Sequence, residues 1–217
     1  DLRATVLRYP MGNIHPRFFA WYMGGSNFTG ALGDFLAAVE GSNLGGGDTA
    51  AAALDGQVVD WLRDLMDFPD GAGGTLTSGG SMANMVALTV ARNAMAGVDV
   101  RAEGVTNLPK PLRFYASDQV HSAHQKAMET LGTRSIDDLP AIAALCQRER
   151  LWFHIDGCIG AFLRLSPRHK ALVDGLDLAD SLALDPHKWL QTPFECGCAL
   201  VRNRRQLFET FNLHGAY

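Results

Sequence analysis

The chain has 217 residues, of which 47% are hydrophobic and 19% are charged, and its formal net charge is −4. This composition is typical of a globular protein with a sizeable core. The basic residues are scattered and no apolar run has the length of a membrane span, so nothing favours nucleic acid or membrane as a partner, and we expect a cytoplasmic protein.

The first half of the chain is predicted to be mostly helical. Residues 1–29 are irregular, with a glycine-rich turn at 24–27. The spacing of apolar residues predicts one helix over 30–43 and a second from Asp48 or Thr49 to about Phe68. A turn and a short strand then lead into a third helix over 80–96.

Strands and helices alternate after residue 110. We expect strands over 112–117, 151–155, 181–185 and 197–202, with helices over 121–131, 138–149 and up to about 212. This alternation predicts an α/β fold with a mainly parallel sheet between helices. Ligands bind such sheets at the carboxyl ends of strands, where Ser117, Asp156 and Asp185 are expected.

Lys188 is one of only four lysines, and it follows the apolar run at 181–184. Desolvation there favours a neutral amine, which can form a Schiff base of the kind that links pyridoxal 5'-phosphate (PLP) to its enzymes. Lys170 belongs to a second His-Lys pair among charged residues, and we expect it to be solvated. Lys110 and Lys126 are also expected to be exposed.

Three other features match the needs of PLP, although each has a plainer interpretation. The run 78–81 (SGGS) opens a helix and can bind phosphate, or it is only a capped turn. Asp156 ends a hydrophobic strand and can keep a pyridine nitrogen protonated, or it is an ion-paired acid. His121 can stack on a ring, or it is only a polar residue at a helix start.

The cysteines and histidines do not indicate a metal site. Four cysteines in a chain of this length do not make a disulfide scaffold. The Cys196–Cys198 pair lacks the second pair that zinc sites carry, and His121 and His124 have no partner cluster in the sequence. We therefore expect structural or cofactor roles for these residues and no bound metal.

Six stretches of the chain carry a family resemblance: 15–21 (HPRFFAW), 77–84 (TSGGSMAN), 115–122 (YASDQVHS), 151–157 (LWFHIDG), 179–181 (ADS) and 185–189 (DPHKW). With these motifs the chain resembles the group II PLP-dependent amino-acid decarboxylases, which include the aromatic-L-amino-acid, histidine, glutamate and diaminobutyrate decarboxylases. The resemblance extends over nearly the whole chain. It implies the large domain of a fold-type I PLP-dependent transferase-like protein.

The resemblance also implies roles for individual residues. Lys188 would carry the Schiff base, Asp156 would pair with the pyridine nitrogen and His121 would stack on the ring. The cofactor would lie among residues that include Gly80, Ser81, Cys158, Asp185 and His187. Trp21, Tyr22 and Gly24 would border an amino-acid substrate, in a site shared between the two subunits of a homodimer.

The chain departs from the family pattern at several points. Asp185 stands where the family has asparagine, and Cys158 stands where it has alanine under the ring. Segments that the family carries near residues 132–133 are absent, and the family continues beyond residue 217 into a small C-terminal domain. We accordingly divide the chain into an N-terminal segment over 1–29, lining the active site, and an incomplete PLP-binding domain over 30–217.

The sequence therefore predicts a PLP-dependent carboxy-lyase that removes the α-carboxylate of an L-amino acid to give an amine and carbon dioxide. Two alternatives remain open. One is another fold-type I reaction, either carbon–carbon cleavage or oxidative deamination to an aldehyde. The other is a non-catalytic module that keeps the fold without the chemistry.

Overall fold

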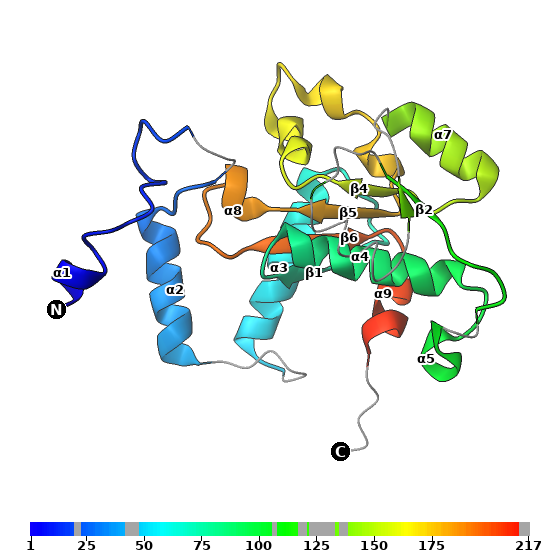
Figure 1. The fold of residues 1–217 in the computed structure, drawn as a ribbon, viewed down its shortest axis with the longest axis horizontal. Helices are drawn as coiled ribbons and strands as arrows, with labels where there is room; N and C mark the ends of the chain where they lie inside the picture. The colour runs from blue at the N-terminus through cyan, green and yellow to red at the C-terminus, as the bar shows by residue number, and fades with distance from the viewer. Residues whose placement is uncertain are drawn as a thin grey trace.

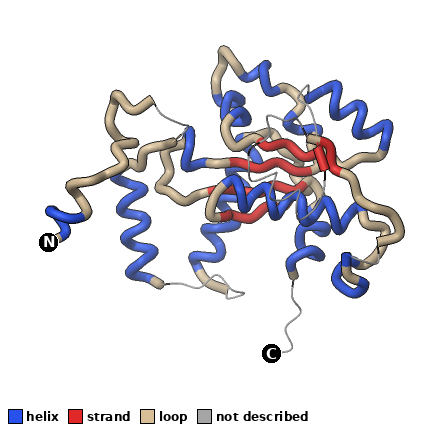
Figure 2. Tube along the Cα trace, viewed as in Figure 1, coloured by secondary structure: helices blue, strands red, loops and turns tan. Residues whose placement is uncertain are grey.

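A computed structural model describes residues 1–19, 23–41, 48–105, 108–116, 121, 133–134 and 139–212, with residues 133–134 described as backbone. Figures 1 and 2 show a central sheet with helices on both sides and an N-terminal region beside it. The helices are α1 (Leu2–Thr5), α2 (Phe28–Glu40), α3 (Ala50–Leu65), α4 (Gly80–Met95), α5 (Val100–Glu103), α7 (Leu139–Glu149), α8 (Pro186–Trp189) and α9 (Arg204–Phe211).

The main sheet has the strand order β1 (Gly73–Thr77), β6 (Gly197–Val201), β5 (Ser181–Leu184) and β4 (His154–Asp156). β4 and β5 are parallel, whereas β6 is antiparallel to both β1 and β5. Three strands thus share one direction, as the sequence predicts, and the reversed β6 makes the sheet mixed. Two shorter strands, β2 (Phe114–Tyr115) and β3 (Thr133–Arg134), form a separate parallel pair.

Side-chain alternation separates the two faces of the sheet. Leu182, Leu184 and Leu200 belong to the larger hydrophobic cluster, which includes residues of α3. Ala183 and Ala199 belong to a smaller cluster on the α4 side. Small side chains on this second face allow α4 to approach the strands closely, and this places the start of α4 at the sheet edge described below.

The helices predicted over 30–43, 48–68, 80–96, 138–149 and up to about 212 are confirmed with small shifts of their ends, whereas the helix predicted over 121–131 lies outside the described residues apart from His121. The helix predicted over 30–43 spans 28–40, and Asn27 caps it by accepting a hydrogen bond from Gly30 N. Thr49 caps α3 in the same way. Three short 3₁₀ helices (Gly160–Leu165, Lys170–Val173 and Leu176–Leu178) connect β4 to β5. No helix within the described ranges is both long and apolar enough to cross a membrane.

Candidate active site

The carboxyl ends of three strands meet at one edge of the sheet. Asp156 is the last residue of β4, and Asp185 directly follows β5. Because β4 and β5 are parallel, both carboxylates lie at the same edge. β1 runs in the same direction and leads through Gly79 into α4. The pattern expected from the sequence for Asp156, Asp185 and the 78–81 run is therefore present.

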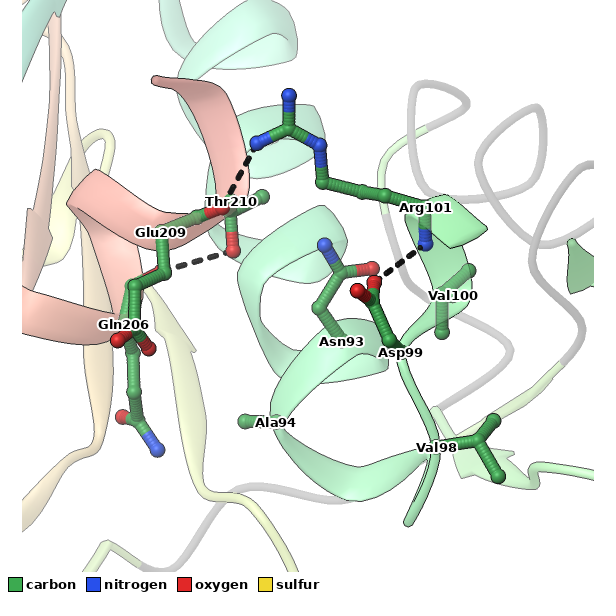
Figure 3. A pocket seen from close by; sticks show the side chains of 9 residues that line it. All are labelled: Asn93, Ala94, Val98, Asp99, Val100, Arg101, Gln206, Glu209 and Thr210. Atoms are coloured by element: carbon green, nitrogen blue, oxygen red, sulfur yellow. Dashed lines mark hydrogen bonds between the residues drawn. The ribbon is translucent and has the colours of Figure 1, made fainter. Parts of the chain in front are cut away.

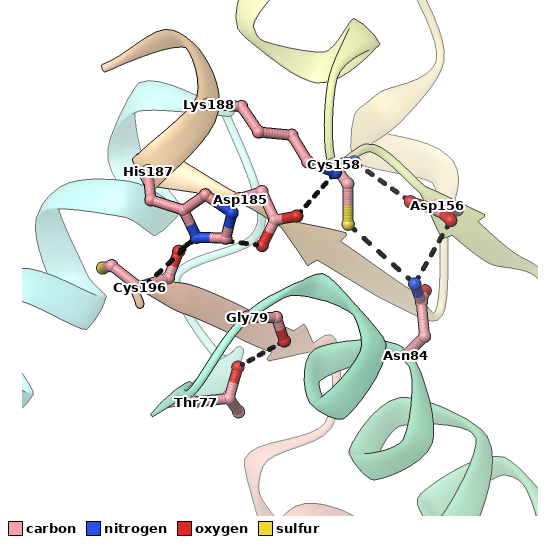
Figure 4. A network of polar contacts seen from close by, with 9 residues as sticks. All are labelled: Thr77, Gly79, Asn84, Asp156, Cys158, Asp185, His187, Lys188 and Cys196. Atoms are coloured by element: carbon pink, nitrogen blue, oxygen red, sulfur yellow. Dashed lines mark hydrogen bonds and ion pairs between the residues drawn. The ribbon is translucent and has the colours of Figure 1, made fainter. Parts of the chain in front are cut away.

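Lys188 lies in the short helix α8, with its side chain directed toward this edge (Figure 4). Its Nζ atom is 2.7 Å from Asp185 Oδ2. The lysine side chain is 21% exposed, whereas that of Asp185 is 3% exposed. The expected desolvated lysine is thus a half-buried lysine whose charge is paired with a buried carboxylate. Sequence reasoning did not anticipate this pair, which i,i+3 spacing on one helical turn makes possible.

Asp185 carries one unsatisfied atom. Its Oδ1 is buried and has no hydrogen-bond partner within the described structure. His187 Nδ1 is 3.8 Å from that oxygen and lies closer to the Cys196 backbone, at 2.7 Å from the carbonyl oxygen and 3.2 Å from the nitrogen. Buried carboxylate oxygens without a donor are costly, so Asp185 Oδ1 is a place where a ligand donor would be stabilised.

Gly80 and Cys158 form a tight contact at the start of α4. A Cβ atom on Gly80 would lie 2.3 Å from Cys158 Sγ and 2.6 Å from Asp185 Oδ2, so only glycine fits. The first-turn N–H groups of a helix have no partner inside it, and no side chain caps α4. Burial raises the pKa of the Cys158 thiol, so the sulfur stays neutral.

Asp156 is exposed at the opening of the site, and both its oxygens accept hydrogen bonds. Oδ1 accepts from Cys158 N at 3.1 Å, and Oδ2 accepts from Asn84 Nδ2 at 3.2 Å. His154 in turn contacts Asn84 Oδ1 through Nε2 at 2.8 Å. Neither Asn84 nor His154 was expected at the site from the sequence. His154 could have been found, because residues two apart on a strand share a face.

Four predicted residues lie partly or wholly beyond this description. Trp21, Tyr22 and Ser117 fall outside the described residues. His121 is described and exposed, but its neighbours in the chain are not, so its stacking role stays a prediction. Ser81, in contrast, is exposed in the first turn of α4, at the same edge as Lys188.

Gly24 lies against the backbone of α8. A Cβ atom there would be 2.0 Å from the His187 carbonyl oxygen and 2.7 Å from that of Lys188. Asn13 Nδ2 donates to the Gly24 carbonyl at 3.2 Å. The N-terminal segment therefore contacts the helix that carries Lys188, and glycine is required for this approach.

A separate hollow lies at the other end of α4, where α4, α5 and α9 meet (Figure 3). Arg101 crosses it and donates to the carbonyl oxygens of Glu209 at 3.1 Å and Asn212 at 2.7 Å. None of the predicted site residues lines this hollow. The chemistry predicted from the sequence thus belongs to the sheet edge.

Comparison with known proteins assigns the fold a family. A profile described as the pyridoxal-dependent decarboxylase conserved domain matches residues 1–136 and 128–217. The chain belongs to this family. It is 33% identical over 254 residues to aromatic-L-amino-acid decarboxylase of Bacillus atrophaeus, covering 94% of this chain and 51% of that protein.

Two further relatives extend the comparison of this pyridoxal-dependent decarboxylase domain. Phenylacetaldehyde synthase of Arabidopsis thaliana is 26% identical, covering 95% of this chain and 53% of that protein. The crystal structure of mouse CSAD in apo form superposes with a TM-score of 0.87 at 26% identity, covering 98% of this chain and 55% of that one. The chain thus spans about half the length of the relatives it matches.

The residues at the sheet edge fit PLP, the cofactor of this family. Lys188 offers the amine, Asp156 an exposed carboxylate, and α4 an uncapped N-terminus over which Gly80 leaves no side chain. Asp185 fits as well, because a singly protonated phosphate has an O–H group that can donate a hydrogen bond to the unsatisfied Oδ1 of Asp185.

Proposed function

We propose that the protein is a PLP-dependent decarboxylase that converts an L-amino acid into an amine and carbon dioxide. The observation that carries the proposal is the placement of Lys188 and Asp156 at the carboxyl ends of neighbouring parallel strands, beside the uncapped start of α4. The name of the Bacillus atrophaeus relative supports an aromatic L-amino acid as the substrate class.

PLP supplies an aldehyde that links to amines and a ring that takes up the electrons left when carbon dioxide departs. The chain's own residues position both parts. The first turn of α4, with Gly80 and Ser81, would hold the phosphate, because its N–H groups have no side-chain cap and favour a negative charge. Asp156 would pair with the ring nitrogen, and its negative charge would favour a proton on that nitrogen.

Lys188 must lose a proton before its amine can form a covalent bond. Asp185 Oδ2, 2.7 Å from Nζ, is placed to accept that proton. The remaining Oδ1 could then accept a hydrogen bond from a phosphate O–H group, while the contacts of His187 with the Cys196 backbone hold the imidazole in place. In this arrangement Asp185, which stands where the family has asparagine, accepts the proton that Lys188 must lose.

The direct test is product analysis. Purified full-length protein is incubated with PLP and with single L-amino acids labelled at C1, and both labelled carbon dioxide and amine are measured. Equal amounts of the two are expected for an aromatic substrate. Lys188→Met should release neither, while Lys170→Met, at the exposed second His-Lys pair, should act as the unmodified protein does.

Aldehyde formation is a second candidate, favoured by the resemblance to phenylacetaldehyde synthase. In that case molecular oxygen is consumed as the two-electron oxidant, and carbon dioxide appears with aldehyde, ammonia and hydrogen peroxide in place of amine. A protein that folds but neither binds PLP nor releases carbon dioxide is instead a non-catalytic module, and this result overturns the proposal.

We further propose a homodimer in which residues 1–29 help to line the active site. None of the residues of α1 or α2 is buried, and Phe28, Phe35 and Val39 expose most of their side chains. A helix with such a face needs a partner, and a second copy would cover it. Sedimentation of the full-length protein at several concentrations, compared with Phe35→Asp, tests this assembly.

The same proposal includes a large domain, over 30–217, that lacks an internal segment of its relatives. The two matched parts of the family profile meet at residues 128–136, close to the junction expected at 132–133. The alignment with the Bacillus protein is also longer than this chain, so it contains positions that the chain lacks. An intact mass of the purified protein tests whether residues are missing there.

A further inference from the structure

A chain of hydrogen bonds leads from the protein interior to Asp156. Trp152 Nε1 donates to Ser181 Oγ at 2.8 Å, and Ser181 Oγ is 2.9 Å from His154 Nδ1. His154 Nε2 is 2.8 Å from Asn84 Oδ1. Asn84 Nδ2 then donates to Asp156 Oδ2 at 3.2 Å. Five residues from α4, β5 and residues 152–156 (the β4 segment, which is β4 and the two residues before it) thus form one connected series, part of which is drawn in Figure 4.

The sheet explains why these side chains meet. Trp152, His154 and Asp156 are two residues apart, so they share one face of the β4 segment. His154 is paired with Ser181 across the parallel β4–β5 ladder. Asn84 lies one turn after Gly80, on the helix that covers this face.

The two ends of the series fix its direction. An indole N–H can only donate a hydrogen bond, and a carboxylate can only accept one. Asn84 must therefore turn its amide nitrogen toward Asp156, which leaves its oxygen to accept from His154. A neutral His154 then carries its proton on Nε2 and accepts the Ser181 hydroxyl proton at Nδ1. Every donor points toward Asp156.

We propose that Asn84, backed by His154, Ser181 and Trp152, is a positioning residue that orients Asp156 and keeps it ionised. The ligand group that Asp156 would bind is a protonated heteroaromatic nitrogen, and this inference rests on the function proposed above. Aligned hydrogen bonds polarise one another, so the series strengthens the donor at Asn84 Nδ2. The last bond is the longest of the four at 3.2 Å, and the charge of its acceptor strengthens it relative to a neutral bond of that length.

Burial supports a role beyond packing. Asn84 is 3% exposed and Ser181 is fully buried, whereas Asp156 is exposed at the site. The interior thus supplies fixed donors to a carboxylate that would otherwise rotate in solvent.

The first experiment compares two ligands bound by the full-length protein. One is PLP and the other is its analogue with C–H in place of the ring nitrogen, each titrated by fluorescence and visible absorption. Asn84→Leu keeps the branched shape and the number of side-chain heavy atoms but removes the donor to Asp156. We expect about 10- to 100-fold weaker binding of PLP, as for loss of a hydrogen bond to a charged group, and little change for the analogue.

The controls separate orientation of Asp156 from general stability. Thr89→Val removes a 2.7 Å hydrogen bond to the Met85 carbonyl on the same helix, outside the series, and should affect both ligands equally or not at all. His154→Phe, like Asn84→Leu, should weaken the binding of PLP more than that of the analogue. His154→Gln, which keeps a donor for Asn84, should recover part of the PLP affinity. Equal losses for both ligands in Asn84→Leu would overturn the proposal.

The second experiment needs no ligand. Nitrogen-15 NMR of the imidazole groups in the full-length protein reports which ring nitrogen carries the proton, and the His154→Gln variant assigns the signal. The proposal requires a proton on His154 Nε2. A neutral His154 protonated at Nδ1 alone would overturn the series whether or not PLP binds. Failure of the unmodified protein to bind PLP would overturn the proposed function and the ligand assignment with it.

Discussion

The central sheet and the N-terminal region of this chain are stabilised differently. All residues of β5 and β6 are buried, and their leucines pack with residues of α3 in one cluster. In α1 and α2 no residue is buried, although α2 is rich in apolar side chains. The sheet therefore stabilises itself, whereas the N-terminal region depends on contacts such as that of Gly24 with α8. The proposed active site lies where these two regions meet.

The largest effect is expected for Lys188→Met. Loss of the amine should abolish the borohydride-stable PLP adduct and lower the decarboxylation rate by at least about 10²-fold. The variant also leaves Asp185, which is 3% exposed, without its charge partner. Without PLP, urea unfolding should show a greater loss of stability for Lys188→Met than for Asp185→Asn. In Asp185→Asn the group left unpaired is Lys188, which is 21% exposed and can still reach solvent. The opposite order would contradict this prediction, because it would mean that the buried Asp185 carboxylate costs less when left alone than the Lys188 amine does.

Truncation of the sheet core comes next. Leu200 is fully buried in β6, so Leu200→Ala should lower the free energy of unfolding by about 2–5 kcal/mol. The matched change in the N-terminal region is Phe35→Ala, at a side chain that is 63% exposed, and it should change that free energy by less than about 0.5 kcal/mol. Chemical denaturation at low protein concentration measures both. Similar costs would mean that α2 belongs to the same cooperative core.

Gly24→Ala tests the contact between the two regions. The added Cβ would overlap the carbonyl oxygens of His187 and Lys188, and backbone strain of this kind costs about 1–3 kcal/mol. We expect the N-terminal segment to separate from α8, which should speed tryptic cleavage after Arg17 with little change in sheet stability. Gly33→Ala in α2, where a Cβ meets open space, is the control and should leave cleavage unchanged.

The smallest effect concerns alkaline pH. Burial raises the pKa values of the Cys158 and Cys198 thiols above their unfolded values. Above about pH 8.5 the unfolded chain loses these protons and the folded chain keeps them, so the free energy of unfolding falls as pH rises. The slope should approach about 1.4 kcal/mol per pH unit for each thiol. In Cys158→Ala the slope should be smaller, and an unchanged slope would exclude this thiol as its source.

The helices, the strand ends at the site and the family of this protein could be predicted from local patterns in the sequence. The 3.6-residue apolar period placed α2, α3, α4 and α7 within a few residues, because that spacing is a property of one helix. The strand ends at Asp156 and Asp185 were predicted for a similar reason. The Lys188 motif and its flanking stretches also indicated the family that the profile match then confirmed.

Only the tertiary structure decided how these elements meet. The reversal of β6 and the pairing of His154 with Ser181 depend on strand register across distant parts of the chain. The contact of Asn84 with Asp156 joins residues 72 positions apart, and no local pattern encodes it. The sequence thus determined which chemical groups reach the sheet edge, while packing decided which of them orient Asp156 and which neutralise Lys188.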